Sequence, residues 1–449
     1  MGIGELQKQY VLKRTELLIY FANTDELNGF KRKLDVLNIR TNEVEISEFI
    51  VEFFKYNDLH IAIFLANKIG PQAAYNSLMI VGNQFPNLKY VVNLGCCANT
   101  EDEDKGCVIV ADKIFDADLR KEKDSGTEYY GNENKHYKLT NKIRNTLRKI
   151  KDIKYEIKYK PLIASSALVN NKDYKEKLVE TFPYAAGIEM EGLAISDYAL
   201  SREIEWIVIK GTSDKGYDKK DHENQEEMAL YASDLFFKII EANGISKSRV
   251  NVFVSGGLHK TKKYKNLEEI QNNSMMLCEK LLSNNYRIIN GFGHIIGPSL
   301  LTSVYKYIRD HKAGDLKDYI ELSPFPRGIN YGDNVIREYF TQNREKMIEK
   351  CLVSIFIYGR NTSDNSYNGM SEEFNIASSK YVPRLVIPQS DFHSIKLFDN
   401  LKTNKFDGIQ STKYKEKAKE LSNNQSFDKS IEIIIEMFKI LDDFYYGLE

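Results

Sequence analysis

The amino-acid sequence predicts an α/β fold made of two consecutive α/β domains. Short apolar runs rich in Val, Ile and Leu alternate with longer amphipathic segments, as strands and helices do in α/β proteins. This alternation is interrupted by small and polar residues at 241–250 and then resumes. A chain of 449 residues with 42% hydrophobic content is long enough for two or three domains. We therefore expect one domain at 1–243 and a smaller one at 250–449.

Each expected strand corresponds to one apolar run. The first series predicts strands at 16–22, 60–66, 89–95, 106–112, 160–166 and 205–211. The second series predicts strands at 249–257, 286–293, 319–326, 352–359 and 383–389. Segment 267–283 between two of these strands is helix-like, and the tail at 426–449 has the i, i+3, i+4 apolar spacing of a packing helix. Alternation of both kinds of element predicts helices packed on a sheet in each domain.

The composition excludes several classes of function. With 63 Lys and Arg against 64 Asp and Glu, the chain has no basic field that would attract nucleic acid or an anionic membrane. Its five cysteines lack paired or metal-ligand spacing, so we expect no disulfide framework, no metal site and a reducing compartment. The sequence shows neither a secretory h-region nor a run of 18 apolar residues. We expect a soluble, cytoplasmic protein without a cofactor.

Acidic residues flank one predicted helix–strand unit. Asp214 follows an apolar strand, and the carboxyl ends of strands are where open α/β sheets bind ligands. Glu189 and Glu191 precede the helix-like segment 192–200, where a helix dipole would keep them ionised. Such carboxylates suit N-glycosidic cleavage, which needs a proton for the leaving base and hydrogen bonds to ribose. The spacing alone equally allows a charge pair at a helix start and a capping Asp214.

The segments "GIEMEGLA" and "WIVIKGTSDKG" resemble the two signature segments of the nucleoside phosphorylase superfamily, in particular its nucleosidase branch that hydrolyses methylthioadenosine. The segments "YVVNLGCCAN" and "PLIASSALVNN" extend the resemblance over about residues 14–240. It implies that Asp214 protonates the purine, Glu191 binds the ribose hydroxyls and Glu26 activates water; for Glu26, a surface glutamate is the alternative. Further substrate-binding positions implied by the resemblance are Glu189, Met190, Gly95, Ser166 and Val169.

The nucleophile and the substrate depend on phosphate binding. Phosphorylases of this superfamily hold phosphate with an arginine near the glycine turn, and the matching stretch "NLKYVVNLGCCANTEDED" contains none. This favours water as the nucleophile. Lys215, Lys219 and Lys220 follow Asp214 and would suit the phosphates of a nucleotide such as ATP or NAD. A solvated charged loop is the alternative.

The second half contains glycine turns that follow predicted strands. Gly256 and Gly257 end one strand, and Gly291, Phe292 and Gly293 end the next. Glycine turns that lead into helices expose backbone N–H groups to phosphate, although tight turns need glycine in any case.

With the later segments "SPFPRG", "LVSIFIYGRN", "NGMSEEFNIA" and "VPRLVIP", this order resembles the SLOG class over about residues 250–390. The resemblance is greatest to the signal-binding domain of Thoeris antiphage effectors. It implies a cyclic ADP-ribose-type signal made by a TIR-domain enzyme. The implied signal-binding residues are Gly256, Gly257, Gly291, Phe292, Gly293, Phe325, Arg344, Arg360 and Glu373.

Together these resemblances predict a signal-activated N-glycosidase of antiphage defence that cleaves an adenine nucleoside or nucleotide. A catalytically inactive nucleotide-binding scaffold and a constitutive purine nucleoside phosphorylase are the alternatives. Because relatives of both halves are oligomers with closed symmetry, we also expect a homo-oligomer.

Overall fold

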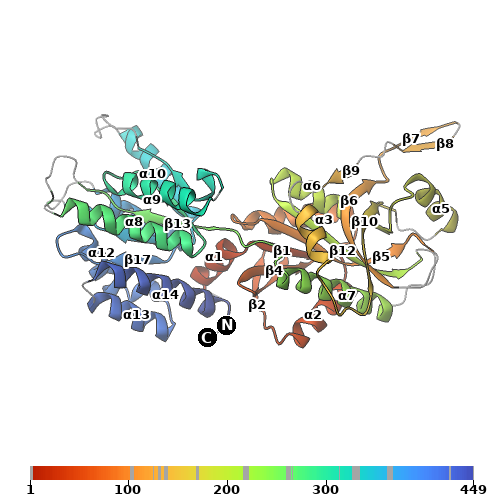
Figure 1. The fold of residues 1–449 in the computed structure, drawn as a ribbon, viewed down its shortest axis with the longest axis horizontal. Helices are drawn as coiled ribbons and strands as arrows, with labels where there is room; N and C mark the ends of the chain where they lie inside the picture. The colour runs from red at the N-terminus through yellow and green to blue at the C-terminus, as the bar shows by residue number, and fades with distance from the viewer. Residues whose placement is uncertain are drawn as a thin grey trace. The chain divides into compact units, whose positions relative to one another are not determined.

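The structure, a computed structural model, describes residues 4–101, 106–124, 126–129, 133–135, 140–167, 171–215, 222–258, 264, 266–312, 314–325, 334–361, 368–423 and 426–447. The chain divides into two compact units. The first unit is Thr15–Lys247, and the second unit joins Met1–Arg14 to Ser248–Glu449. Both units combine helices with a sheet, so the predicted α/β class is confirmed (Figure 1).

The first unit is built on a ten-stranded mixed sheet. Its strand order is β11-β10-β6-β12-β5-β1-β4-β3-β2, with β9 paired to β6. Because β11 also pairs with β5, one part of the sheet closes on itself. The strands are β1 (Leu17–Phe21), β2 (Asn42–Ile46), β3 (Phe49–Tyr56), β4 (Leu59–Leu65), β5 (Tyr90–Asn99), β6 (Cys107–Asp116), β9 (Glu133–Lys135), β10 (Glu156–Ala164), β11 (Gly187–Glu189) and β12 (Glu205–Asp214).

Helices cover both faces of this sheet. The helices of the first unit are α2 (Thr24–Val36), α3 (Pro71–Val81), α4 (Thr140–Leu147), α5 (Lys172–Thr181), α6 (Gly192–Ser201) and α7 (His222–Glu241). Helices α2 and α7 pack together on one side, and α3 and α6 pack together on the other (Figure 1). Phe30 of α2 and Phe237 of α7 stack with ring centroids 5.6 Å apart in the main core of the unit. Strands with apolar side chains on both faces are expected where helices cover both faces.

The second unit has a five-stranded parallel sheet in the order β15-β14-β13-β16-β17. Its strands are β13 (Val250–Ser255), β14 (Tyr286–Asn290), β15 (Ile320–Leu322), β16 (Val353–Ile357) and β17 (Arg384–Ile387). The strand order reverses between β13 and β16, and open α/β sheets bind ligands at the carboxyl ends of strands beside such a reversal. The helices are α1 (Glu5–Arg14), α8 (Leu267–Ser283), α9 (Ile296–His311), α10 (Asn334–Glu349), α11 (Gly369–Ser379), α12 (His393–Thr403), α13 (Thr412–Asn423) and α14 (Phe427–Tyr445).

Helix α1 packs in the second unit, whereas the sequence placed it in the first domain. The hydroxyl of Tyr10 donates to Asp442 at 2.7 Å, and Nε of Arg14 lies 3.0 Å from the same carboxylate. Lys13 donates to the carbonyl of Lys380 at 3.4 Å. The boundaries therefore differ from the expected 1–243 and 250–449, because the partners of α1 lie hundreds of residues away along the chain.

The structure also contains strands that the sequence pattern did not reveal. β2 and β3 form an antiparallel hairpin beside β4, in a segment where acidic residues interrupt the apolar run. Glu189 ends the short strand β11, whereas we expected it to start a helix. The hairpin of β7 (Arg120–Lys123) and β8 (Gly126–Tyr129) forms a separate small sheet.

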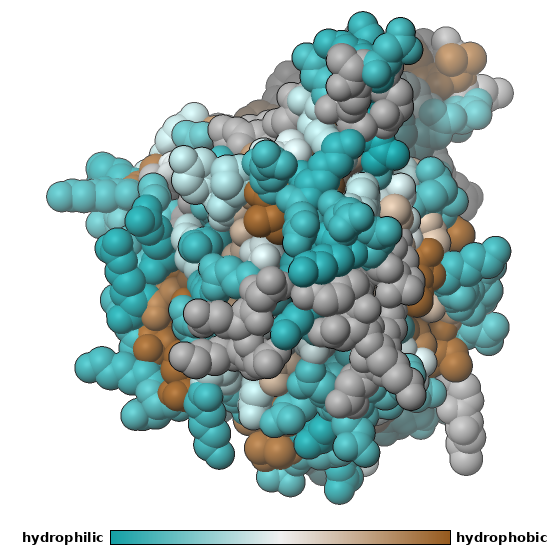
Figure 2. Space-filling model, turned by 90° about the vertical axis from the view of Figure 1, so that its right-hand side faces the viewer, coloured by the Kyte–Doolittle hydropathy of each residue, from teal (hydrophilic) through white to brown (hydrophobic). Residues whose placement is uncertain are grey.

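One face of the first unit is mainly hydrophilic, with small and separate hydrophobic patches (Figure 2). The most exposed large apolar side chains of this unit are Tyr184, Val36 and Ile50, at 78%, 70% and 63%. No helix within the described residues has the length and hydropathy needed to cross a membrane.

Candidate active site and ligand pocket

The candidate active site lies where β1, β5 and β12 are neighbours in the sheet. In their parallel register Tyr20 is opposite Asn93, and Gly95 is opposite Lys210. Residues with the same register on adjacent strands point to the same face, so Tyr20, Asn93 and Lys210 share one face. Glu26 reaches this region from the first turn of α2, where the side chain of Asn23 caps the helix by accepting from the backbone N–H of Glu26.

Lys210 is the charged residue of this region that the sequence analysis missed. Its Nζ lies 3.1 Å from Oε1 of Glu26, and both side chains are almost fully buried. Burial lowers the pKa of Lys210, but the carboxylates of Glu26, Glu191 and Glu189 outweigh burial and raise it above its usual range. The lysine is therefore charged and balances several acids. The sequence feature that could have revealed this residue is a lysine within the apolar run "WIVIKG".

Glu26 is buried, so the alternative of a surface glutamate is wrong. Its exposed fraction is 2%. Its carboxylate accepts from the backbone N–H groups of Ala22 and Cys96, each at 2.9 Å. Gly95 makes this geometry possible, because a Cβ at that position would lie 1.8 Å from Oε1 of Glu26. The glycine turn therefore makes room for a carboxylate.

Glu189 and Glu191 have different surroundings. Oε2 of Glu189 accepts from the backbone N–H groups of Glu191 and Gly192 at 2.9 and 2.7 Å, so this carboxylate caps the start of α6. Glu191 accepts from the N–H of Gly70 at 3.0 Å. Burial, opposed by Lys210 but reinforced by Glu189 and Glu26, raises the pKa of Glu191 to about 7. Glu191 therefore changes its charge near neutral pH, whereas one oxygen of Glu189 is held by the backbone at the start of α6.

Asp214 is the last residue of β12 and is only partly buried. The hydroxyl of Ser213 donates to its carboxylate at 2.9 Å, and the amide of Asn224 in α7 donates to the carbonyl of Ser213. Burial and the charge of Glu26 raise the pKa of the Cys96 thiol, Lys210 opposes them, and Asp214 adds a smaller increase. Asp214 therefore lies near the glycine turn that contains Cys96. It has an accessible position at the carboxyl end of a strand, where it can exchange a proton with a ligand.

The other predicted substrate residues have mixed outcomes. Met190 is half-buried between the two glutamates, as packing against a sugar would require. Ser166 is exposed just beyond β10, and its backbone N–H donates to Asp118 at 2.7 Å. Val169 lies outside the described residues, as do the predicted phosphate partners Lys219 and Lys220.

Two further polar atoms are buried beside this cluster without a hydrogen-bond partner in the described part of the chain: the hydroxyl of Tyr20 and Oδ1 of Asn93. Burial, then the carboxylates of Glu191 and Glu26, raise the pKa of Tyr20, which keeps it a neutral hydrogen-bond donor. Unpaired buried polar groups in a native protein indicate a bound water or ligand that satisfies them. Neither residue is distinguished by the pattern of the sequence.

The arrangement can support hydrolysis of an N-glycosidic bond. Glu26, held beside Lys210, can accept a proton from a water molecule, and Glu191 can accept hydrogen bonds from ribose hydroxyls when ionised. Asp214 can donate a proton to a departing base. The three carboxyl groups come from α2, the start of α6 and the end of β12, so the sheet brings together residues that are far apart in the sequence.

The second unit has a pocket at the carboxyl ends of β13, β14 and β16, with a volume of about 480 Å³. Eight predicted signal-binding residues line it: Gly256, Gly257, Gly291, Gly293, Phe325, Arg344, Arg360 and Glu373. Phe292, which the structure describes, is not among the lining residues. The two glycine turns pack on each other, since a Cβ on Gly293 would lie 2.1 Å from the carbonyl oxygen of Gly256.

Arg344 and Arg360 differ in their surroundings. Arg344 is buried and makes ion pairs with Glu373 at 3.2 Å and Glu372 at 3.1 Å, and its guanidinium lies 4.5 Å from the ring centre of Phe325. Burial, opposed by Arg344 and by a hydrogen bond from Ser255, raises the pKa of Glu373. Arg360 is exposed at the pocket edge and has no ion pair with any residue that the structure describes. Arg360 is thus the cation better placed for an incoming phosphate.

Comparison with known families gives the same two-part organisation. Residues 16–242 match the phosphorylase superfamily, and residues 238–441 match the Sir2- and TIR-associating SLOG family. The chain thus joins a nucleosidase-like α/β unit to a Rossmann-like α/β unit of the SLOG class. The chain belongs to the phosphorylase superfamily and carries a Sir2- and TIR-associating SLOG domain in its second half, which confirms both resemblances.

Individual relatives are distant. An NAD(+) hydrolase, ThsA, of Enterococcus faecium is 25% identical over 173 residues, which are 37% of this chain and 34% of the relative. A death domain-containing ATP nucleosidase of Amphimedon queenslandica is 24% identical over 248 residues, 49% of this chain and 46% of the relative. This chain thus spans about a third to a half of these relatives. An S-adenosylhomocysteine nucleosidase of Streptococcus pyogenes has a TM-score of 0.43 and 16% identity, over 51% of this chain and 96% of that one.

Proposed function

We propose that the protein is a signal-gated N-glycosidase that hydrolyses an adenine nucleoside or nucleotide, with ATP and NAD as the leading substrates. The proposal is supported by the buried group of Glu26, Lys210 and Glu191, with Asp214 at the end of the strand that carries Lys210. Distant relatives are named NAD(+) hydrolase and ATP nucleosidase, and both activities break an N-glycosidic bond.

In the proposed reaction water attacks the anomeric carbon of the ribose. Glu26 takes a proton from this water, with the ammonium of Lys210 3.1 Å from its carboxylate. The bond to the base breaks as Asp214 gives its proton to the purine nitrogen, and ionised Glu191 stabilises the oxocarbenium-like sugar through its hydroxyls. Free base and ribosyl product are released. Proton transfer through solvent returns the proton from Glu26 to Asp214.

The second unit is the proposed sensor. Its glycine-lined pocket offers backbone N–H groups and the exposed Arg360 to a pyrophosphate, which supports a cyclic ADP-ribose-type signal made by a TIR-domain enzyme. Binding can gate the first unit only if the signal binds the active arrangement more tightly than the resting one. In a cell this would make the protein an antiphage effector that consumes an adenine nucleotide when the signal is bound. The proposed effector is a cytoplasmic homo-oligomer.

The test is a base-release assay. The purified protein is mixed with adenosine, ATP or NAD, with and without a cyclic ADP-ribose isomer, and free adenine and nicotinamide are separated and quantified. We expect release that depends on the cyclic nucleotide and not on inorganic phosphate. Release that requires phosphate would identify a phosphorylase. The absence of release from all three substrates would support the alternative of a catalytically inactive nucleotide-binding scaffold. Light scattering on the active sample tests assembly, and an active monomer would contradict the expected oligomer.

A further inference from the structure

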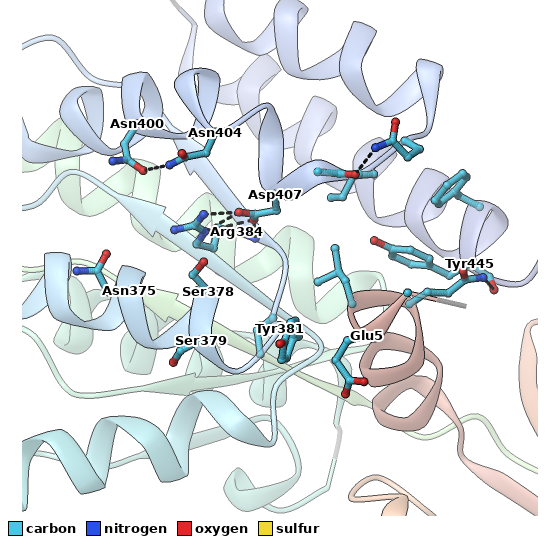
Figure 3. A pocket seen from close by; sticks show the side chains of 18 residues that line it. Glu5, Asn375, Ser378, Ser379, Tyr381, Arg384, Asn400, Asn404, Asp407 and Tyr445 are labelled. Carbon is cyan, nitrogen blue, oxygen red and sulfur yellow. Dashed lines mark hydrogen bonds and ion pairs between the residues drawn. The ribbon is translucent and has the colours of Figure 1, made fainter. Parts of the chain in front are cut away.

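The second unit contains another pocket, at the end of its sheet opposite the glycine-lined pocket. It has a volume of about 900 Å³ and lies beside Arg384, the first residue of β17 (Figure 3). Its walls come from α1, α11, α12, α14 and the segment after α12. Ligands of open α/β sheets usually bind at the carboxyl ends of strands, so this cavity at an amino end is separate from the proposed signal site.

One wall of this pocket is a strained turn. Lys405, Phe406, Asp407 and Gly408 all have positive φ, at 50°, 52°, 59° and 73°. Side-chain-bearing residues seldom adopt this left-handed conformation, and three in succession persist only where surrounding contacts fix them. The fixing contact is an ion pair, because Nε of Arg384 lies 2.9 Å from the carboxylate of Asp407. Such strain concentrates at ligand clamps and switch regions.

A buried hydroxyl points into the cavity from another wall. The hydroxyl of Tyr445 has no hydrogen-bond partner among the described residues, although its side chain is only 3% exposed. Figure 3 shows this hydroxyl directed into the pocket from α14. Burial and the charge of Asp407 raise the pKa of Tyr445, so it remains a neutral donor. A buried donor of this kind requires a ligand or an ordered water.

The remaining lining is polar but carries little positive charge. Arg384 is neutralised by Asp407, and Glu5 adds a negative charge, so the pocket disfavours phosphates. Five lining side chains are amides, and they are Asn375, Asn400, Asn404, Gln7 and Gln410. Asn404 donates to Asn400 at 2.8 Å, Gln7 to the carbonyl of Tyr445 at 3.0 Å and Gln410 to the carbonyl of Gly408 at 2.9 Å, and each of these three donors keeps a second N–H. Amides match the paired donor and acceptor on the edge of adenine, and the 46%-exposed Tyr381 offers a ring on which a base can stack.

We propose that this cavity is a second ligand site that binds an uncharged adenine or adenosine. Helix α11 contacts both pockets, since Gly369, Met370 and Glu373 line the signal pocket while Asn375 and Ser378 line this one. A ligand held here is therefore coupled to the signal pocket through one short helix. The product-sensing role rests on the proposed N-glycosidase activity: where that activity releases adenine, the site would report accumulated product.

The test measures binding and its location. The Asp214→Asn variant is used so that no nucleoside is consumed, and adenine, adenosine and AMP are added in turn. Hydrogen-exchange mass spectrometry should show protection of α1 and of segment 404–410 with adenine or adenosine. Equilibrium dialysis should show at least tenfold weaker binding of AMP at this site, because its phosphate meets an uncompensated negative charge. No protection of these segments, or preferred binding of AMP, would overturn the proposal.

Matched variants assign the effect to the cavity. Tyr445→Phe removes the unpaired hydroxyl, so its Tm should not fall while affinity for adenosine falls about three- to tenfold. Tyr446→Phe is the control, because that neighbouring hydroxyl donates to the carbonyl of Val11 at 3.4 Å and does not line the cavity. Arg360→Ala should leave adenosine binding here unchanged. Equal affinity of Tyr445→Phe and wild type would overturn the site, whatever the base-release assay shows, so the two proposals can fail independently.

Discussion

Lys210 and Glu26 form an ion pair of 3.1 Å in which neither side chain is more than 3% exposed. Burying two charges costs more than a hydrophobic pair of similar volume, so a buried pair is weak evidence of a stabilising role. The pair lies among Glu189, Glu191 and the unpaired hydroxyl of Tyr20. The proposed role in catalysis is a reason for these groups to be held together away from water.

Removing the cation of this pair should destabilise the fold. Lys210→Met leaves Glu26 and Glu191 without their shared counter-ion, and breaking a buried pair in this way costs about 3–5 kcal/mol. Urea denaturation measures the loss of unfolding free energy. The double variant Lys210→Met, Glu26→Gln should recover part of it, because the acid left unpaired is then neutral. Equal losses in the single and double variants would mean that the two residues are not coupled.

Glu191 predicts how activity depends on pH. With a pKa raised to about 7 from 4.5, Glu191 is protonated at pH 6 and ionised at pH 8. Because the ionised form binds the ribose hydroxyls, ionisation of Glu191 should give kcat/KM a rising limb centred near pH 7. Glu191→Gln should lower kcat/KM and remove this rise. A rise centred near the ordinary carboxyl value in the unmutated protein would show that Glu191 is not the controlling group.

Asp214→Asn should reduce base release by about 100-fold or more, because the amide keeps the shape of the side chain but has no acidic proton. Product chromatography measures the rate, and an unchanged Tm shows that the fold is intact. Asp35→Asn serves as a matched control, since it makes the same substitution at an exposed residue in the last turn of α2 that has no proposed role in either site. Full activity in Asp214→Asn would assign proton donation to another group.

Gly95→Ala tests the position of Glu26 without changing any charge. The new methyl group would overlap the Glu26 carboxylate, so Glu26 or the turn must move. A displacement of this size at a catalytic base can lower kcat about 100-fold. Steady-state kinetics would detect the loss. An unchanged kcat would show that Glu26 is not the base that activates water.

The two arginines of the glycine-lined pocket should behave differently. Arg360→Ala should weaken binding of a cyclic ADP-ribose isomer by about tenfold, because one charge-assisted hydrogen bond is lost. The Tm of this variant should change little. Arg344→Ala should lower Tm as well, because Glu372 and Glu373 lose their counter-ion. Calorimetric titration and thermal unfolding distinguish the two outcomes. Wild-type affinity in Arg360→Ala would move the phosphate contact elsewhere.

Local pattern predicted the central strands well because each is a continuous apolar run. β1, β5 and β12 begin within one residue of their expected starts, and Asp214, expected just after its strand, is the last residue of β12. Glycine spacing and family resemblance also placed eight signal-pocket residues around one cavity. These successes concern features whose residues are close in the sequence.

What could not be predicted depends on contacts between distant segments. The ion pair of Lys210 with Glu26 joins residues 184 positions apart, and an apolar run gives no indication of what a lysine within it contacts. The cavity beside Arg384 has walls from five segments and a left-handed turn that residue types such as Lys405 and Phe406 do not suggest. Helix α1 has its partners at the opposite end of the chain.

The placement of α1 gives the protein an insertion topology. Thr15–Lys247, the proposed catalytic module, is inserted into the discontinuous second unit, the proposed sensor, and both of its ends are covalently joined to segments of that unit. A protease that cuts once, at either junction, would therefore not separate the modules, because the severed chain is still joined at the other junction. After a cut near residue 247, α1 would still be docked through Tyr10 and Arg14 on Asp442. Release of the catalytic module requires two cuts.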